Sequence, residues 1–340
     1  MRYNYINKIK FLFFALKKYL FSTERTQKMI KKRILTVSSA NMDFVMNVTR
    51  VPNAGETLLD NGTFRFVPGG KGANAAVTVG RLGGDSVFCT RLGNDRNGAE
   101  LRAIYAREGI DCRFIVTDPA RATGLAAIAV EPSGQNRITV FPGANTAICK
   151  DDIESAMLCR PDALFMQLEI SPDAVVYAAR YAAERDIPVF IDAGPALPDF
   201  PFEKLPRLEV FSPNETETEA YTGIVPSSPD ACLRAATALS RIVDAHYYVI
   251  KLGSRGAYIY DGKYYFCLPA YDVKAVDTTA AGDAFTSALT LEYLRCGDIE
   301  RAGKYANLVG AMTVGRAGAL PSIPTAAELE KFMKTYGLNI

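Results

Sequence analysis

Histidine is nearly absent from this chain. His246 is the only histidine among 340 residues, and it precedes Tyr247-Tyr-Val-Ile250, a run typical of a strand. A Ser-His-Asp or Cys-His mechanism would have to use this one residue, whose place at a strand entrance does not suit a catalytic base. The sequence therefore nearly excludes the hydrolases that depend on histidine.

The chain also lacks cysteine pairs, a strong charge and a long apolar run. Its seven cysteines are scattered without a C-x-x-C pair, which is typical of reduced, mostly buried thiols in a cytosolic protein. The net charge of +2 is too small to indicate nucleic-acid binding. The apolar run at 11–16 is too short to span a bilayer. We therefore expect a cytoplasmic protein with no nucleic-acid or membrane partner.

What the chain does contain is a regular alternation of strand and helix patterns. Expected strands lie at 33–37, 86–90, 163–168, 188–191, 209–212 and 247–250. Polar or glycine-rich turns and then helix patterns follow most of them, which predicts an α/β fold: a doubly wound, mostly parallel sheet with helices on both faces. Residues 44–67 and 121–141 have β patterns without helices and predict a small β-sheet lid. We expect one domain over 31–340, with 1–30 as an extension outside the fold.

The segment Asp277-Thr-Thr-Ala-Ala-Gly-Asp283 combines a predicted anion site with a carboxylate. It follows an expected strand at 274–276 and begins an expected helix that ends at Gly297. Small residues at 280–282 leave the first N–H groups of the helix uncovered, and such groups bind anions. Asp283 would lie beside that anion. It is either a favourable first-turn acid or the base that activates a hydroxyl for phosphoryl transfer.

A second ligand site is predicted at Pro68-Gly-Gly-Lys-Gly-Ala-Asn74. The segment is not a P-loop, because Arg65 replaces the first glycine and Gly72 replaces the Ser or Thr after the lysine. Its two glycines before Lys71 nevertheless permit a close approach of the backbone to a ligand. Lys71 and Asn74 would offer donors from adjacent helical turns. We interpret this combination as a ligand site and not as a solvated helix start.

Six motifs follow one another along residues 32–324. They are Asn41-Met-Asp43, Gly69-Gly-Lys-Gly-Ala-Asn74, Met166-Gln-Leu-Glu169, Pro213-Asn-Glu-Thr-Glu217, Leu252-Gly-Ser-Arg-Gly256 and Asp277-Thr-Thr-Ala-Ala-Gly-Asp283. In this order and spacing they resemble the ribokinase family of sugar kinases, also called the PfkB family. The resemblance implies a doubly wound sheet with a small β lid, and phosphorylation of a sugar, first of all D-ribose at O5, by ATP with magnesium and a potassium activator.

The resemblance also implies roles for the residues at matching positions. Asp283 would be the catalytic base, with Ala280, Ala281 and Gly282 as the anion hole. The sugar hydroxyls would be held by Asn41, Asp43, Gly70, Lys71, Asn74 and Glu169. The nucleotide and its magnesium would be held by Asn214, Glu217, Lys251, Gly253, Ser254, Gly256 and Asn307. Potassium would be bound by Asp277, Thr279, Thr313, Arg316, Gly318 and Ser322, several through backbone carbonyls.

Two positions depart from the family pattern. Lys251 stands where ribokinases often carry threonine, and Asp192-Ala-Gly-Pro195 replaces an Asn-Pro-Ala-Pro-like turn. Both departures lie on the expected nucleotide side, so they bear more on nucleotide binding than on the expected choice of sugar.

Other functions stay open at this point. A related kinase could act on deoxyribose, fructose or a nucleoside. A sugar-binding sensor would need no base, so Lys71 together with Asp283 argues against it. A dinucleotide oxidoreductase is weaker still, since no G-x-G-x-x-G follows the first strand. Finally, the free edges and exposed surface of the small lid predict a homodimer that pairs through the lids.

Overall fold

The computed structural model describes residues 31–338. The apolar run at 11–16 and the interpretation of residues 1–30 as an extension lie outside the described residues. Within 31–338, no helix combines the length and the hydrophobicity needed to cross a membrane.

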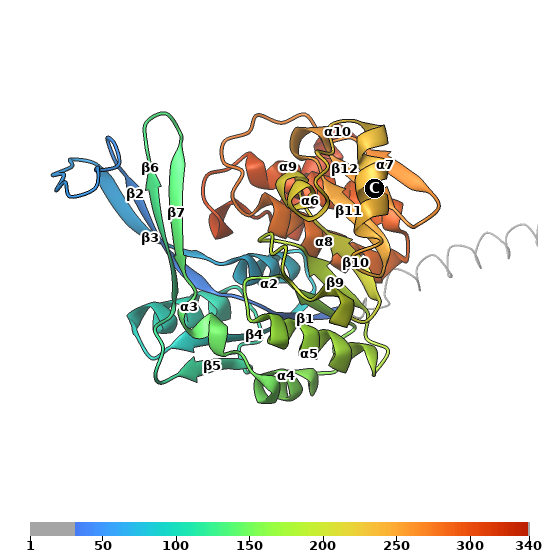
Figure 1. Ribbon diagram of the computed structural model, residues 1–340, viewed down its shortest axis with the longest axis horizontal. Helices are drawn as coiled ribbons and strands as arrows, with labels where there is room; N and C mark the ends of the chain where they lie inside the picture. The colour runs from blue at the N-terminus through green and yellow to red at the C-terminus, as the bar shows by residue number, and fades with distance from the viewer. Residues whose placement is uncertain (1–30, 339–340) are drawn as a thin grey trace, which may run out of the picture. The chain divides into compact units, whose positions relative to one another are not determined.

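A nine-stranded sheet forms the centre of the described chain (Figure 1). Its order is β13-β12-β11-β10-β9-β8-β1-β4-β5. The strands are β1 (Arg33–Val37), β4 (Asp85–Gly93), β5 (Ile115–Asp118), β8 (Ala163–Met166), β9 (Val189–Asp192), β10 (Leu208–Ser212), β11 (Ala245–Lys251), β12 (Ala257–Tyr260) and β13 (Tyr265–Leu268). All neighbours from β11 to β5 are parallel, whereas β12 and β13 are antiparallel at one edge. The predicted mostly parallel sheet is confirmed.

Helices cover both faces of this sheet, as predicted. They are α2 (Lys71–Arg81), α3 (Arg96–Arg107), α4 (Lys150–Met157), α5 (Pro172–Ala183), α6 (Glu215–Thr222), α7 (Pro229–Leu239), α8 (Ala281–Cys296), α9 (Ile299–Val314) and α10 (Ala326–Tyr336). Leu35 packs in a core with residues of α4, α5 and α7, whereas its neighbour Ile34 packs in a second core with α2, α8 and α9. Successive residues of a strand point to opposite faces, so β1 is buried on both faces from Ile34 to Val37.

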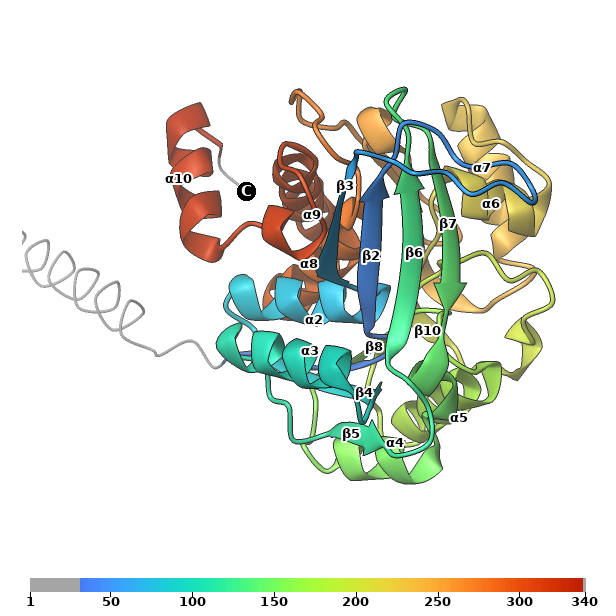
Figure 2. The ribbon, with the colours of Figure 1, turned by 90° about the vertical axis from the view of Figure 1, so that its left-hand side faces the viewer.

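A separate four-stranded sheet, called the small sheet below, has the order β3-β2-β6-β7. Its strands are β2 (Asn41–Asn47), β3 (Thr63–Gly69), β6 (Gly124–Val130) and β7 (Asn136–Phe141). Figure 2 shows these strands side by side. β2 begins a few residues after β1 ends, so the first strand of the central sheet leads directly into the small sheet.

Several expected elements differ in the structure. Residues 274–276 do not form a strand, because the N–H groups of Val276 and Asp277 both bond to the carbonyl of Val314 at the end of α9 and not to a neighbouring strand. Residues 48–62 form a loop, in which the side chain of Asp60 accepts hydrogen bonds from Thr49. The expected β segments in these two places were therefore wrong.

Two side-chain expectations can also be compared with the structure. Among the cysteines of the described chain, Cys89, Cys159 and Cys232 are buried, Cys112 and Cys296 are half-buried, and Cys149 and Cys267 are exposed, so the expectation of mostly buried thiols is met only in part. His246 lies on the surface with its Nδ1 3.0 Å from Glu209 Oε2. His246 is the second residue of β11, so it lies at the start of a strand, as the sequence indicated.

Candidate active site

The helix α8 begins at a turn that is suited to binding an anion. Ala280 has a φ of +63°, in the left-handed region where a small side chain keeps the strain low. Within the described residues, no side chain caps the N-terminus of α8. The N–H of Ala281 bonds to the carbonyl of Thr278. In the part of the chain that the structure describes, the N–H groups of Gly282 and Asp283 have no backbone partner, so these two stay available to a ligand, and the helix dipole adds positive potential at the same place.

Asp283 lies in this first turn and is almost completely buried. Its carboxylate accepts hydrogen bonds from Asn74 Nδ2 at 2.8 Å and from Gln167 Nε2 at 3.2 Å. Lys71 Nζ lies 3.9 Å from Asp283 Oδ1. Burial raises the pKa of Asp283 to about 6, although the ammonium of Lys71 opposes the rise. A carboxylate with a pKa just below neutrality is ionised at neutral pH and still a useful proton acceptor.

The residues predicted to hold a sugar gather around this carboxylate. Lys71 donates its backbone N–H to Glu169 Oε2 at 3.3 Å, and Glu169 Oε2 also accepts from the hydroxyl of Ser39. Burial, with the charges of Glu169 and Asp283, raises the pKa of Asp43 to about 7. Asp43, Glu169 and Asp283 thus form a cluster of carboxylates around one lysine, whose pKa the Asp283 charge raises. Such a cluster suits a ligand that donates several hydroxyl groups.

Two glycines make this cluster possible. Gly70 has a φ of +90°, and a Cβ added there would lie 2.7 Å from the backbone nitrogen of Asn41. A Cβ at Gly69 would lie 2.1 Å from Asp43 Oδ2. The backbone before α2 can therefore approach the start of the small sheet only because these positions lack a side chain. The close approach brings Asn41 and Asp43 of one motif together with Lys71 of another.

A cavity of about 530 Å³ opens on the other side of the α8 turn. Its lining includes Lys251, Gly253, Ser254, Gly256 and Asn307 of the predicted nucleotide site, together with Ala281 and Gly282. The amide of Asn307 donates to the carbonyls of Leu268 and Pro269, so it holds the segment after β13 against α9. The predicted anion hole thus lies in the wall of the cavity predicted for the nucleotide.

Asn214 and Glu217 stand at the start of α6 and not in the lining of that cavity. Asn214 Oδ1 accepts from the N–H of Glu217 at 2.8 Å, and Glu217 Oε2 accepts from the N–H of Asn214 at 2.7 Å. This reciprocal capping box explains their spacing as a helix start. Burial raises the pKa of Glu217, while Lys251 lowers it, so Glu217 lies within range of the charges at the cavity.

Some of the residues predicted to bind a monovalent cation contact one another. Asp277 accepts from the N–H of Thr279 at 2.9 Å and from the N–H of Gly318 at 2.8 Å, which joins two distant segments. The hydroxyls of Thr313 and Ser322 are buried and donate to the carbonyls of Val309 and Ala319. Because these hydroxyls are already bonded, Thr313 and Ser322 could bind an ion only through their backbone carbonyls.

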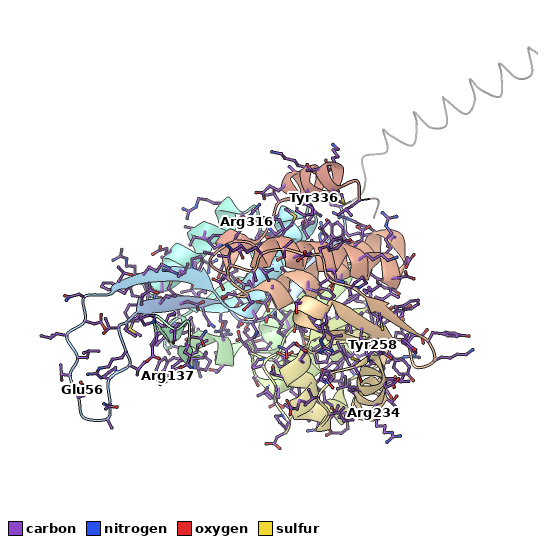
Figure 3. All side chains as sticks on the ribbon, turned by 90° about the horizontal axis from the view of Figure 1, so that it is seen from above. Glu56, Arg137, Arg234, Tyr258, Arg316 and Tyr336 are labelled. Carbon is purple, nitrogen blue, oxygen red and sulfur yellow. The ribbon has the colours of Figure 1, made fainter. Side chains whose placement is uncertain are left out.

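Arg316 is arranged differently from the rest of that group. Its guanidinium lies 2.9 Å from Glu328 Oε1 in α10, so its side chain is engaged there and only its backbone is available to an ion. Figure 3 labels Arg316 and Tyr336 beside the C-terminal helices. Among residues 31–338, no group of three or more His, Cys, Asp or Glu side chains is arranged to hold a metal.

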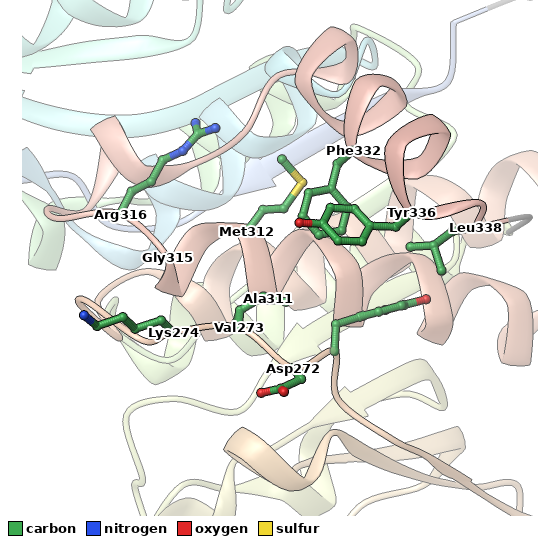
Figure 4. A pocket seen from close by; sticks show the side chains of 11 residues that line it. Asp272, Val273, Lys274, Ala311, Met312, Gly315, Arg316, Phe332, Tyr336 and Leu338 are labelled. Carbon is green, nitrogen blue, oxygen red and sulfur yellow. The ribbon is translucent and has the colours of Figure 1, made fainter.

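A second cavity of about 610 Å³ adjoins the first (Figure 4). It lies between α9, α10 and the segment before α8, and the two cavities share the wall formed by Tyr271, Asp272, Val273 and Ala311. Of the predicted site residues, it contains Arg316. Sequence reasoning gave no sign of this cavity, because aromatic residues of α10 such as Phe332 look like ordinary core residues.

Polar residues outside the predicted binding sets complete the site. Gln167 donates to Asp283 although it was noticed only as part of a motif, and Asn145 Nδ2 donates to Asn41 Oδ1 at 2.8 Å. Asp192 and Thr286 both contact Lys251 Nζ, at 2.7 and 3.3 Å. A polar residue at the end of a buried strand, as at Gln167 and Asp192, was the available signal.

Comparison with known proteins agrees with this arrangement. Residues 31–326 match the family described as pfkB family carbohydrate kinase. A bifunctional ribokinase/ribose-5-phosphate isomerase A of Fructilactobacillus sanfranciscensis is 34% identical over 86% of this chain, which spans only 55% of that protein. A deoxyribokinase of Salmonella typhi is 30% identical over 90% of this chain and 99% of its own length. The structure of Arabidopsis thaliana ribokinase complexed with ribose and ATP superposes with a TM-score of 0.82 at 28% identity, over 90% of this chain and 99% of that one. The chain belongs to the pfkB family of carbohydrate kinases.

Proposed function

We propose that this protein phosphorylates D-ribose at its 5-hydroxyl with ATP as the donor. The observation that carries the proposal is the position of Asp283 at the uncapped start of α8, between the carboxylate cluster of the sugar side and the cavity of the nucleotide side. The proposed base, the proposed anion site and the two proposed binding regions would thus meet at one turn. Similarity to proteins named ribokinase supports ribose as the sugar.

The arrangement suits an in-line transfer. Asn41, Asp43, Lys71, Asn74 and Glu169 would fix the sugar so that its 5-hydroxyl faces Asp283. Asp283 would take the hydroxyl proton as the oxygen bonds to the γ-phosphorus of ATP and the bond to the leaving ADP oxygen breaks. The N–H groups of Gly282 and Asp283 would stabilise the charge on the transferring group. Positioning supplies much of the rate in such reactions.

Magnesium would be held on the nucleotide side by Glu217 and Asn214 together with the donor's phosphates, because oxygen ligands suit this ion. When bound, it neutralises charge on the β- and γ-phosphates. The buried carboxylate of Glu217, near Lys251 and Asp192, fits this role. Gly253, Ser254, Gly256 and Asn307 would then surround the nucleoside part of ATP.

A panel assay tests the proposed substrate. ATP consumption should be fastest with ribose when ribose, 2-deoxyribose, fructose and nucleosides are compared at equal concentration. Deoxyribose is the second candidate, because a deoxyribokinase is among the full-length relatives. Preference for another sugar would change the proposed substrate but leave the proposed kinase activity standing. ATP turnover with none of them, despite measurable sugar binding, would favour the sensor instead.

Potassium activation is expected. Asp277 contributes a charge, while Thr279, Thr313, Arg316, Gly318 and Ser322 would contribute mainly backbone oxygens, a donor set for a large monovalent ion more than for magnesium. Activity at fixed magnesium and ionic strength should rise when potassium replaces tetramethylammonium. The rise should shrink in Asp277→Asn and persist in Asp261→Asn, an exposed control in the β12–β13 turn. A flat response of the unmodified protein would contradict the cation site.

We also propose that residues 31–340 form one cytoplasmic kinase domain in which the small sheet acts as a lid. The register of β2 places Asn41 and Asp43 on one face of this sheet. Phe44, Phe66 and Phe64 lie on the opposite face, where the Phe44 and Phe66 rings stack at 4.9 Å. Phe64 is 70% exposed. One face would close over the sugar while the other presents aromatic surface to a second copy of the chain.

A homodimer through the small sheets is therefore expected. Phe64→Glu would place a charge in that interface and should halve the mass measured by light scattering at micromolar concentration. Leu59→Glu is the matched control, since Leu59 is also exposed but lies in the loop beyond the strands, and it should leave the dimer intact. Figure 3 shows Glu56 of the same loop far from the labelled residues of the main body. A monomeric mass of the unmodified protein, with and without ribose and nucleotide, would refute the pairing.

A further inference from the structure

We propose that the ammonium of Lys251 binds the terminal phosphates of the donor nucleotide, and that Asp192 and Thr286 are positioning residues that hold it there. This inference rests on the proposed kinase function and adds a phosphate-contacting cation to it. The two departures from the family pattern, at 192 and at 251, would then serve one phosphate contact.

The first support is a buried contact between these residues. Lys251 ends β11 and Asp192 ends β9, and their side chains are about nine-tenths buried. Lys251 Nζ lies 2.7 Å from Asp192 Oδ1 and 3.3 Å from the hydroxyl of Thr286. That hydroxyl donates to Asp192 Oδ2 at 2.7 Å. The carboxylate therefore holds both the lysine and the threonine, which leaves the ammonium little freedom to move.

The second support is where the ammonium points. A Cβ added at Gly282 would lie 3.6 Å from Lys251 Nζ, so the ammonium stands beside the first turn of α8. Lys251 also lines the cavity on the nucleotide side. On the other side of the same turn, Lys71 Nζ lies 3.9 Å from Asp283 Oδ1. Two ammonium groups thus flank the predicted anion hole, one toward the sugar and one toward the nucleotide.

The third support is the count of hydrogen-bond donors. An ammonium has three N–H donors, and within the described residues Asp192 and Thr286 accept from two of them. The third donor is available to an oxygen in the adjoining cavity. Burying an ion pair is costly and adds little stability compared with apolar packing, so a buried lysine at the edge of a ligand cavity is better explained by a ligand than by the fold.

The ammonium of Lys251 offsets negative charge that would otherwise repel an anionic ligand. Asp192 and Glu217 place carboxylates near it, and a neutral residue at 251 would leave these carboxylates facing a polyphosphate with less positive charge between them. A lysine acts on phosphate as a point charge, as in other phosphate sites. The contact should favour ligands that carry β- and γ-phosphates and should matter little for a nucleotide that ends at the α-phosphate.

The test compares ADP with AMP, measured by calorimetry on the full chain. Lys251→Met should weaken ADP binding about 10- to 100-fold, the worth of a hydrogen bond to a charged group. AMP binding should change about twofold or less. The apparent KM for ATP should rise in parallel with the loss of ADP affinity. Lys263→Met, an exposed lysine in the β12–β13 turn, is the control and should behave as the unmodified protein.

The positioning role of Asp192 has its own readout. Asp192→Asn should weaken ADP binding when Lys251 is present and have no further effect in the Lys251→Met background, because the two residues act through one contact. The unpaired Asp192 could prevent the Lys251→Met variant from folding. In that case, ADP and AMP binding are measured on the double variant Asp192→Asn/Lys251→Thr, which lacks both charges.

The outcomes separate this inference from the proposed function. Equal losses for ADP and AMP, or unchanged ADP binding, would overturn the phosphate contact even if the protein is an active ribose kinase. Selective loss of ADP binding would support it even if ribose is not the sugar. Failure of the unmodified protein to bind ADP or ATP would overturn both.

Discussion

Replacement of Asp283 by asparagine is expected to lower turnover about 10²- to 10⁴-fold, the usual contribution of a general base. The amide has nearly the same size as the carboxylate and still accepts a hydrogen bond from Asn74 or Gln167 through its oxygen. It cannot accept the proton of the sugar hydroxyl. Sugar affinity should therefore change much less than turnover.

The measurement pairs ADP production at saturating substrates with sugar binding by calorimetry. Asp230→Asn is the matched control, because Asp230 is also an acid in the first turn of a helix, α7, but is exposed there. If Asp283 served only as a favourable first-turn acid, both variants would lose a little stability and keep their turnover. Near-normal turnover of Asp283→Asn would remove Asp283 from the mechanism.

Replacement of Lys71 by methionine should reduce kcat/KM about 10²- to 10³-fold, comparable to removing a preorganised donor from a charge-stabilising site. It should also change the pH dependence. Lys71 lowers the pKa of Asp283, whereas burial raises it. Without the ammonium, the pKa of Asp283 should move above its present value of about 6. A base works only when ionised, so activity is lost as the pH falls through this pKa, and the loss should begin at a higher pH in the variant.

The pH profile of kcat/KM tests this prediction, because it reports groups of the free enzyme. Lys71→Arg keeps the positive charge and should leave the acid side of the profile near that of the unmodified protein, even where its geometry lowers the rate. Lys263→Met controls for loss of a lysine at the surface. An acid limb that does not shift in Lys71→Met would show that Lys71 and Asp283 are not electrostatically coupled in the working enzyme.

Much of the fold could be predicted from local patterns. The runs at 33–37 and 163–166 are mostly apolar on both faces, which is typical of a strand that is covered by helices on both sides. Turn glycines and helix periodicity placed α2 and α8 close to their observed starts. The strands β12 and β13 were missed, because each has only four residues and carries little periodic signal; β12 is almost wholly buried, and the edge strand β13 mixes exposed and buried positions. The expected strand at 274–276 failed because its backbone partner is the end of a helix far along the chain.

The sequence by itself determined the α/β class, the family and the predicted role of Asp283, because these depend on short motifs and on periodicity within single elements. Only the tertiary structure decided what surrounds that carboxylate. Asn74 and Gln167 stand 209 and 116 positions from Asp283, and Asp192 stands 59 positions from Lys251. Parallel strands bring their carboxyl ends to one edge of the sheet, so residues from distant βα units meet there. A contact between side chains so far apart in sequence leaves no local pattern, and therefore the pairing of Lys251 with Asp192 could be found only in the folded chain.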